Sequence, residues 1–289
     1  MLPMALAILF AGLLSAGSCA SGGNPRESVS QEITKTTRRK TAGAAFAVYT
    51  EDMQIPLWKE LPSGLAGKSS PALDINLKLI DFAASTAGSP EQLFNNTFYR
   101  GLSVRDYARE LIRVQTIEYQ EMGEEAQNNP AIMNSASLNW YYSEDLDAPL
   151  DSPQVLVISR NRSFYSGGAH PTSDKTYFVF DRKEAARVRL SDIIPEESMP
   201  LLRQLANREL RAGKRLGPSD SLTKALFFVD EAELPEDFFF SPQGLSLHWN
   251  PYEIAPYSEG YIEITIPAGE IKNLLSSRGR YLTGELWKE

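Results

Sequence analysis

Two hydrophobic periodicities divide the chain. Apolar residues first recur every three to four positions, over 71–86 and again over 103–122. This spacing gathers them on one side of a helix, so it predicts two amphipathic helices. Ser103 and Asp106 resemble a capping box and mark where the second helix begins. The apolar positions are Leu73, Leu77, Ile80 and Ala84 in the first helix, and Val104, Tyr107, Ala108, Leu111 and Ile112 in the second.

Strand-like patterns dominate the rest of the chain. These segments are rich in aromatic and β-branched residues and alternate in part between apolar and polar positions. Strands are predicted at 44–50, 135–142, 154–165, 176–181, 237–240, 245–249 and 260–266. A loop or short turn followed by a helix is predicted within 190–213, and a short helix from about Ala268.

This order of elements predicts the fold class. Helices followed by runs of hairpin-linked strands indicate an α+β fold, with antiparallel sheets and packed helices. We expect two intimately associated modules, an N-terminal one over 44–154 and a C-terminal one over 155–289.

The N-terminus has the features of an export signal. Residues 1–18 carry no charge, and their apolar stretch is shorter than a membrane-spanning helix requires, so a signal peptide is expected. The only cysteine, Cys19, follows directly, in the position that a bacterial lipobox would lipidate. Plain secretion with an incidental cysteine is the alternative. The polar segment 19–43 is expected to be a flexible tether of an extracytoplasmic protein, held at the periplasmic or outer cell surface by a lipid anchor.

Composition argues against several functions. A formal net charge of −8 disfavours nucleic acid and polybasic membrane binding. The sequence contains no nucleophile elbow, zinc-protease motif or phosphate-binding loop, so we expect no cofactor, no metal and no assigned catalytic residue. The acidic stretch "VDEAELPEDFFF" from Val229 to Phe240 lacks calcium-loop spacing and is interpreted as a solvated loop.

The two histidines lie in different patterns. His170 belongs to "YSGGAHP", where Gly167 and Gly168 are expected to include a positive φ and Pro171 fixes the backbone. Its imidazole either hydrogen-bonds a neighbouring loop or is available to a ligand. His248 alternates with Leu245, Leu247 and Trp249, so it is expected on the opposite, solvent-facing side of its strand.

Two motifs together carry a family resemblance. "YSGGAHP" is followed by the strand "TYFVFD" and then "LSDII", and the strand "GLSLHW" leads into "NPYEIAPY". In this order they resemble the RsiV/PdaC-like bacterial extracytoplasmic family of unknown function, over about residues 155–277. Residues 44–154 resemble the module that usually precedes it. The sequence shows neither the sigma-binding segment nor the deacetylase domain of those proteins, so their anti-sigma and deacetylase roles do not carry over.

The resemblance implies a surface that binds a partner, because the module of the sensor binds lysozyme through its surface. We expect a non-catalytic module whose ligand is a lysozyme-like protein or a peptidoglycan fragment. The expected ligand-binding residues are His170, Tyr252, Tyr257 and Tyr261. One alternative is a cell-wall glycan hydrolase or deacetylase that uses His170 or His248 with nearby carboxylates, and convergence of both histidines with Glu253 or Asp181 would favour it. Another is a structural envelope protein without a ligand.

Overall fold

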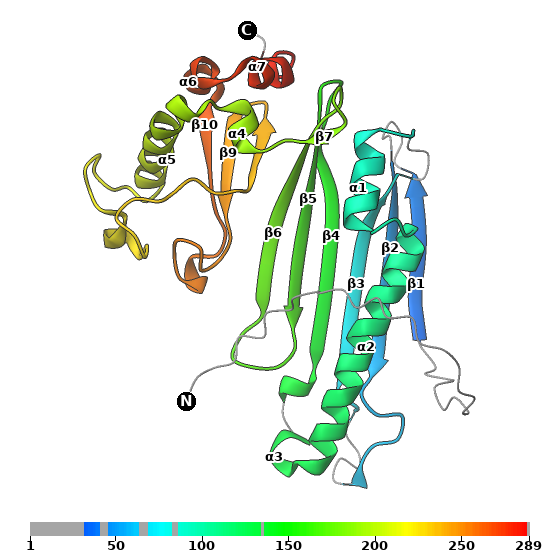
Figure 1. Cartoon of the computed structure of the whole chain (residues 1–289). Coiled ribbons are helices and arrows are strands. Elements are labelled where there is room, and N and C mark those ends of the chain that lie inside the picture. The colour runs from blue at the N-terminus through cyan, green and yellow to red at the C-terminus, as the bar shows by residue number, and fades with distance from the viewer. Residues whose placement is uncertain (1–31, 41–45, 64–68, 83–85, 134–135, 288–289) are drawn as a thin grey trace, which may run out of the picture. The chain divides into compact units, whose positions relative to one another are not determined.

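The chain folds into two β-sheets with helices packed on them (Figure 1). The computed structural model describes residues 32–40, 46–63, 69–82, 86–133 and 136–287. The expected signal peptide and Cys19 lie outside the described residues, as does the tether up to residue 31. The α+β class expected from the sequence is confirmed.

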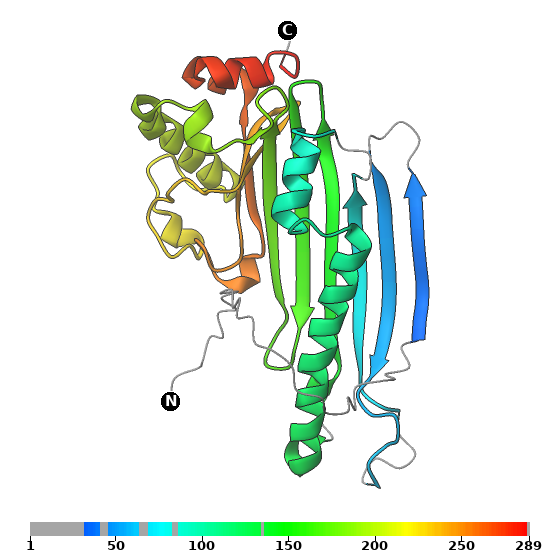
Figure 2. The ribbon, with the colours of Figure 1, turned by 45° about the vertical axis from the view of Figure 1, so that its right-hand side comes forward.

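The larger sheet has seven strands, which follow one another in chain order. They are β1 (Glu32–Lys40), β2 (Ala47–Pro56), β3 (Ala72–Asp81), β4 (Trp140–Asp151), β5 (Val155–Tyr165), β6 (Thr172–Asp181) and β7 (Ala186–Arg187). Neighbouring strands pair antiparallel, except β3 and β4, which run parallel. A parallel pair needs a long crossover. Here it passes through α1 (Pro90–Phe98) and α2 (Val104–Asn128), which lie on one face of the sheet (Figure 2).

The prediction of a helix over 71–86 is wrong, because this segment contains β3. Leu73 and Leu77 satisfy helical spacing, but Ile75 and Leu79 complete a period of two, and all four are buried. The strand is paired on both sides, with β2 and with β4, and α2 covers it. Burial against a sheet neighbour on each side therefore outweighs the weaker helical pattern.

The predicted tether also contains a strand, so the prediction is wrong for β1. Residues 32–40 pair antiparallel with β2 and extend the sheet by one edge strand. An edge strand needs only the backbone groups of its neighbour, and the segment "EITKTTRRK" supplies β-branched residues without a conspicuous apolar pattern. That is why a composition-based interpretation missed it.

Helix α2 confirms the prediction for 103–122. Ser103 is its N-cap, and the Ser103 hydroxyl accepts a hydrogen bond from the Asp106 backbone N–H at 3.1 Å. The helix buries Ala108, Ile112 and Tyr119 against the sheet. Helix α1 was not predicted, although Ser89 and Pro90 form an ordinary N-terminus for it.

The C-terminal part builds the smaller sheet. Its antiparallel strands β8 (Phe238–Ser241), β9 (Gly244–Trp249) and β10 (Ile262–Pro267) have the order β10-β9-β8, and they confirm the predictions at 237–240, 245–249 and 260–266. The remaining α-helices are α3 (Pro130–Met133), α4 (Leu190–Ile193), α5 (Met199–Gly213), α6 (Ala268–Ile271) and α7 (Ser277–Thr283). The 3₁₀ turns are η2 (Ala136–Leu138), η3 (Glu196–Ser198), η4 (Leu222–Ala225), η5 (Tyr257–Glu259) and η6 (Lys272–Leu274).

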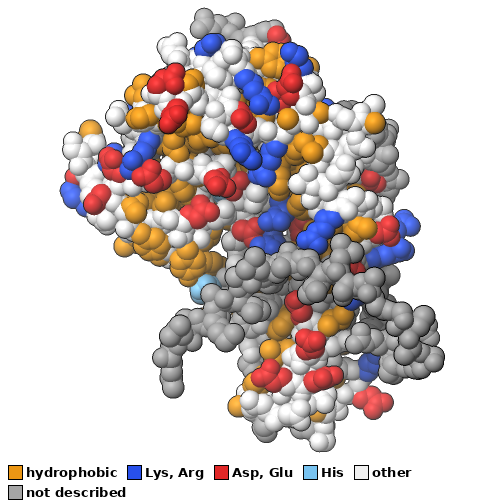
Figure 3. Space-filling model, viewed as in Figure 1, with side chains coloured by type: hydrophobic (Ala, Val, Ile, Leu, Met, Phe, Trp, Pro, Cys, Tyr) orange, Lys and Arg blue, Asp and Glu red, His pale blue; other side chains and the backbone are white. Residues whose placement is uncertain are grey.

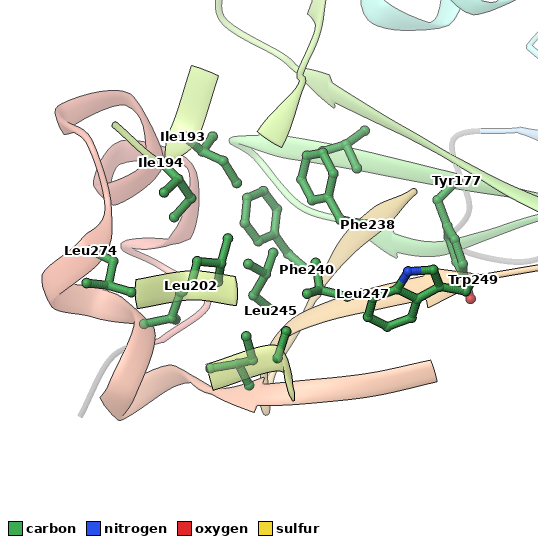
Figure 4. Close-up of a cluster of buried hydrophobic side chains, with 14 of the residues drawn as sticks. Tyr177, Ile193, Ile194, Leu202, Phe238, Phe240, Leu245, Leu247, Trp249 and Leu274 are labelled. Atoms are coloured by element: carbon green, nitrogen blue, oxygen red, sulfur yellow. The ribbon is translucent and has the colours of Figure 1, made fainter. Parts of the chain in front are cut away.

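Two hydrophobic cores lie on opposite faces of the larger sheet. In β5, Leu156 and Ile158 belong to the core under α1 and α2, whereas Val155 and Val157 belong to the core with the smaller sheet and α5. Figure 4 shows part of this second core, where Leu202 packs with Phe240 and Leu245. Because β4 and β5 pair across residue 154, both expected modules contribute to one sheet. Their boundary stays a prediction. Among the described helices, none has the length and apolar character needed to cross a bilayer.

Candidate functional site

Two distant loops bring three of the four predicted ligand-binding residues together. His170 lies in the β5–β6 connection, and Tyr252 and Tyr257 lie in the β9–β10 connection. The imidazole of His170 stacks on the Tyr257 ring, with centroids 4.4 Å apart and planes inclined by 20°. The Nε2 atom of His170 lies 3.2 Å from the Tyr252 hydroxyl. We call these three residues the aromatic cluster.

The glycine turn gives His170 its position. Gly167 and Gly168 have φ values of 89° and 104°, which confirms the expected positive φ. The Tyr165 hydroxyl donates to the Gly168 carbonyl at 2.9 Å and holds the turn closed. Nδ1 of His170 lies 2.9 Å from the Pro171 carbonyl, which can only accept. This contact favours a proton on Nδ1 and leaves Nε2 to accept from the Tyr252 hydroxyl.

The second loop is fastened to the edge of β6. The Asn250 side chain accepts from the Lys175 backbone N–H at 2.7 Å and donates to the Lys175 carbonyl at 3.0 Å. Tyr252 then adopts a left-handed backbone with φ of 72°, and its N–H donates to the Ala255 carbonyl at 3.0 Å. Ile254 and Ala255 are buried beneath the loop, while the Tyr252 side chain stays 56% exposed. The loop therefore presents tyrosine to solvent from a buried base.

The prediction that His248 faces solvent is wrong, because its side chain is completely buried. Its strand β9 is central in the smaller sheet, and Tyr177 from β6 covers the face that alternation assigned to solvent. The Tyr177 and His248 rings meet edge to face at 5.5 Å. Tyr261 also contacts His248, and the centroids of the two rings lie 5.4 Å apart. Tyr261 thus contacts a different histidine from the one in the aromatic cluster.

A small set of charged groups surrounds His248. Nδ1 lies 3.5 Å from Glu263 Oε2, at the outer limit of a hydrogen bond, and neither ring nitrogen has a partner of ordinary geometry among the described groups. The His248 imidazole has the largest effect on the pKa of the Glu263 carboxyl. Together with Lys175 it holds this pKa below the usual value, although Glu263 is partly buried. Tyr177 donates to Glu263 at 3.1 Å, and burial raises the pKa of its phenol.

The two histidines do not converge on one site. His170 contacts Pro171, Tyr252 and Tyr257, whereas the neighbours of the His248 ring are Tyr177, Tyr261 and Glu263. Within the described part of the chain, the two rings thus share no neighbour. Across the described ranges, no three His, Cys, Asp or Glu side chains are grouped as metal ligands would be.

The carboxylates proposed for the alternative enzyme site have other contacts. Asp181 is buried, accepts from the backbone N–H groups of Lys183 and Glu184 at 3.0 and 3.1 Å, and pairs with Arg278 at 3.1 Å. It therefore fastens the turn after β6. Glu253 is exposed and accepts from Asn250 at 3.4 Å. Among the described residues, neither acid pairs with a histidine.

A small apolar cavity of about 160 Å³ lies elsewhere, between α1 and the strands β6 and β7. Its lining residues are Leu93, Phe94, Thr97, Phe98, Phe178, Phe180 and Arg187. Arg187 is its single charged side chain, so this cavity offers no acid–base pair for catalysis.

Sequence reasoning missed Asn250, which holds the second loop in place. The one indication in the sequence is its position between the strand "GLSLHW" and Pro251. Asparagine side chains often hydrogen-bond backbone groups at such turns. Pro171 follows His170 as expected, and its carbonyl accepts a hydrogen bond from Nδ1 of the ring, so it supports the ring as well as the turn.

Comparisons with known proteins agree with the resemblance carried by the two motifs. Residues 191–269 match the family model described as protein of unknown function (DUF3298). The anti-sigma-V factor RsiV of Bacillus subtilis strain 168 is 27% identical over 140 residues, which make up 45% of this chain. The match covers 47% of RsiV, so this chain spans about half the length of that relative.

Two solved structures share the fold. A DUF3298 family member from Bacteroides fragilis NCTC 9343 aligns with a TM-score of 0.66 and 23% identity, over 84% of this chain and 98% of its own. A DUF3298 family protein from Pseudomonas aeruginosa PAO1 aligns with a TM-score of 0.50 and 16% identity, over 83% of this chain and 96% of its own. The family resemblance predicted from the sequence is therefore confirmed.

Proposed function

We propose that this chain, which carries a DUF3298 domain over residues 191–269 and is a relative of RsiV, is a non-catalytic binding module of the cell envelope. Its partner would be a lysozyme-like protein, because the module of the RsiV-type sensor binds lysozyme through its surface. A peptidoglycan fragment is the other ligand considered. Lipidation at Cys19 would anchor the module to a membrane on the extracytoplasmic side.

The observation that carries this proposal is the contact between His170 and Tyr257. It joins the two motifs that define the resemblance, with His170 exposed and Tyr257 half-buried. Tyrosines are rigid and amphipathic, and they are enriched among the residues that dominate binding energy at interfaces. A merely architectural contact would have no reason to leave Tyr252 more than half exposed.

Charge supports a basic protein as the partner. The chain has a formal net charge of −8, and lysozymes are typically basic, so opposite charges would speed their encounter. The separate surroundings of the two histidines favour binding over the alternative glycan hydrolase or deacetylase, which convergence of both rings at one site would have supported.

A capture experiment tests the proposal. The full-length chain would be immobilised in detergent and offered purified lysozyme and, separately, purified muropeptides. We expect lysozyme to be retained, and retention to fall by at least about tenfold in a His170→Ala/Tyr257→Ala variant. Tyr281→Ala is the matched control, because Tyr281 is also exposed but belongs to α7.

Each outcome has a clear consequence. Retention of muropeptides alone would replace the protein partner with a glycan ligand at the same site. Retention of neither, or equal retention by the cluster variant and wild type, would contradict the proposal.

A further inference from the structure

A second group of exposed apolar side chains lies in the loop between η4 and β8. Leu226 is 62% exposed, Phe228 56% and Val229 36%. The intervening Phe227 is buried in the core, so the loop turns one side chain inward and its neighbours outward. We call Leu226, Phe228 and Val229 the apolar patch. Single exposed apolar residues are ordinary, but three within four positions are not.

The backbone of this loop is strained in a way that exposes the patch. Leu226 has a φ of 68°, a left-handed conformation that residues with a branched side chain rarely adopt. Tyr252 in the aromatic cluster has the same feature, with a φ of 72°. In both cases the residue with the left-handed backbone also turns a large side chain toward water. This exposure is a second unfavourable contribution to the free energy of folding. Such outliers persist where the surrounding structure determines them, and they cluster at functional sites.

The apolar patch adjoins the aromatic cluster. The Phe228 backbone N–H donates to the Ile254 carbonyl at 2.9 Å, which aligns the patch with the loop that holds Tyr252 and Tyr257. Figure 3 shows hydrophobic side chains gathered beside the histidine visible in that view. The Phe228–Ile254 bond therefore sets the loop of the apolar patch beside the loop of the aromatic cluster.

Acidic residues border this surface. The segment that follows Val229 exposes Asp230, Glu231, Glu233 and Glu236. Glu231 and Glu233 pair with Arg211 and Arg203, at 3.0 and 2.8 Å. Within the part of the chain that the structure describes, Glu236 and Glu253 form no ion pair. The border thus keeps uncompensated negative charge, which a partner with Lys or Arg around an apolar centre would complement.

We propose that the apolar patch and the aromatic cluster form a single docking surface for a basic protein, with Leu226 and Phe228 as its second anchor. This inference rests on the proposed function and extends it from one loop pair to a larger interface. An apolar side chain of the partner covers Leu226 and Phe228, and basic residues of the partner face Glu236 and Glu253.

The test measures affinity and stability in the same variants. Lysozyme is the probe, titrated against the full-length chain by calorimetry. Leu226→Asn suits a left-handed backbone, so this variant should keep or raise the urea midpoint while it removes the apolar contact. We expect Leu226→Asn combined with Phe228→Ser to weaken binding by at least about tenfold. Leu201→Ser is the matched control, because Leu201 is 46% exposed on α5, and it should leave binding unchanged.

The outcomes separate this inference from the proposed function. Binding that survives the loss of Leu226 and Phe228 but not of His170 and Tyr257 contradicts the inference alone. Binding that falls only in step with the urea midpoint also contradicts it, because the role of the patch would then be structural. If wild type does not bind lysozyme, the proposed function fails and the inference fails with it.

Discussion

The side chain of Asn250 replaces a neighbouring strand at Lys175. It accepts from the Lys175 N–H at 2.7 Å and donates to its carbonyl at 3.0 Å. Strand β7 pairs with β6 only at Phe180 and Asp181, so this edge of β6 has no strand beside Lys175 among the described residues. The Asp237 side chain accepts a hydrogen bond from the Tyr177 backbone N–H, two positions along β6, at 3.0 Å. Side chains of the C-terminal part thus fasten it to the larger sheet.

Asn250→Ala should destabilise the fold by about 1–3 kcal/mol, because it leaves two backbone groups of Lys175 without their partners. The urea unfolding midpoint measures this. Asn96→Ala on the exposed side of α1 is the control and should change it little. Equal midpoints for Asn250→Ala and wild type would show that the contact does not hold the two parts together.

The glycine turn should tolerate side chains poorly. Gly168→Val is expected to cost about 1–3 kcal/mol, because a β-branched residue would have to adopt its φ of 104°. Space is not the cause, since no atom lies within 4 Å of a Cβ built there. Gly213→Val is the control: Gly213 also has open space, but no positive φ. If both variants unfold at the same urea concentration, backbone strain is not what selects glycine.

The pair of His248 and Glu263 predicts a pH dependence. The pKa of Glu263 is lowered in the folded state, so its carboxylate stabilises the protein above the unfolded pKa of about 4.3 and stops doing so as pH falls through the folded value. Glu263→Gln should therefore be less stable than wild type at pH 7, by about 0.5–1 kcal/mol because Glu263 is partly exposed. The difference should shrink as the pH falls below the unfolded pKa and the carboxyl becomes protonated in both states. A stability gap in urea titrations that widens on acidification would contradict this.

Helix α2 and most strands follow from local patterns, because capping and periodicity agree with the tertiary structure there. β3 shows where local patterns fail to predict the structure. Leu73 and Leu77 fit both the helical and the strand period, and only pairing with β2 and β4 decides between them. Local patterns also fail at β1, since an edge strand needs partners rather than an apolar pattern.

The candidate site is predictable in its residues but not in its geometry. The motifs named His170, Tyr252 and Tyr257, yet His170 and Tyr252 lie 82 positions apart, and tertiary contacts such as that of Asn250 with β6 bring them together. Local alternation placed His248 in solvent, because it cannot report that Tyr177 from another sheet covers that face. The exposure of Leu226 depends equally on a backbone conformation that composition does not encode.

Lipidation at Cys19 stays a prediction that a fractionation experiment tests. Cys19→Ala should move the protein from the membrane fraction to the soluble fraction, because a lipobox lipidates a cysteine and Cys19 is the only cysteine in the sequence. Immunoblots of separated membranes give the readout. A variant that fractionates like wild type would show that Cys19 is not the anchor.

Hydrogen–deuterium exchange of the full-length chain, with and without purified lysozyme, reports whether the partner docks on the aromatic cluster. We expect slower exchange at 165–172 and 250–258, the two loops that meet at His170 and Tyr257. The exposed side of α2, on the other face of the larger sheet, should exchange at the same rate in both samples. Unchanged exchange in both loops at saturating lysozyme, or protection confined to other segments, would contradict the account.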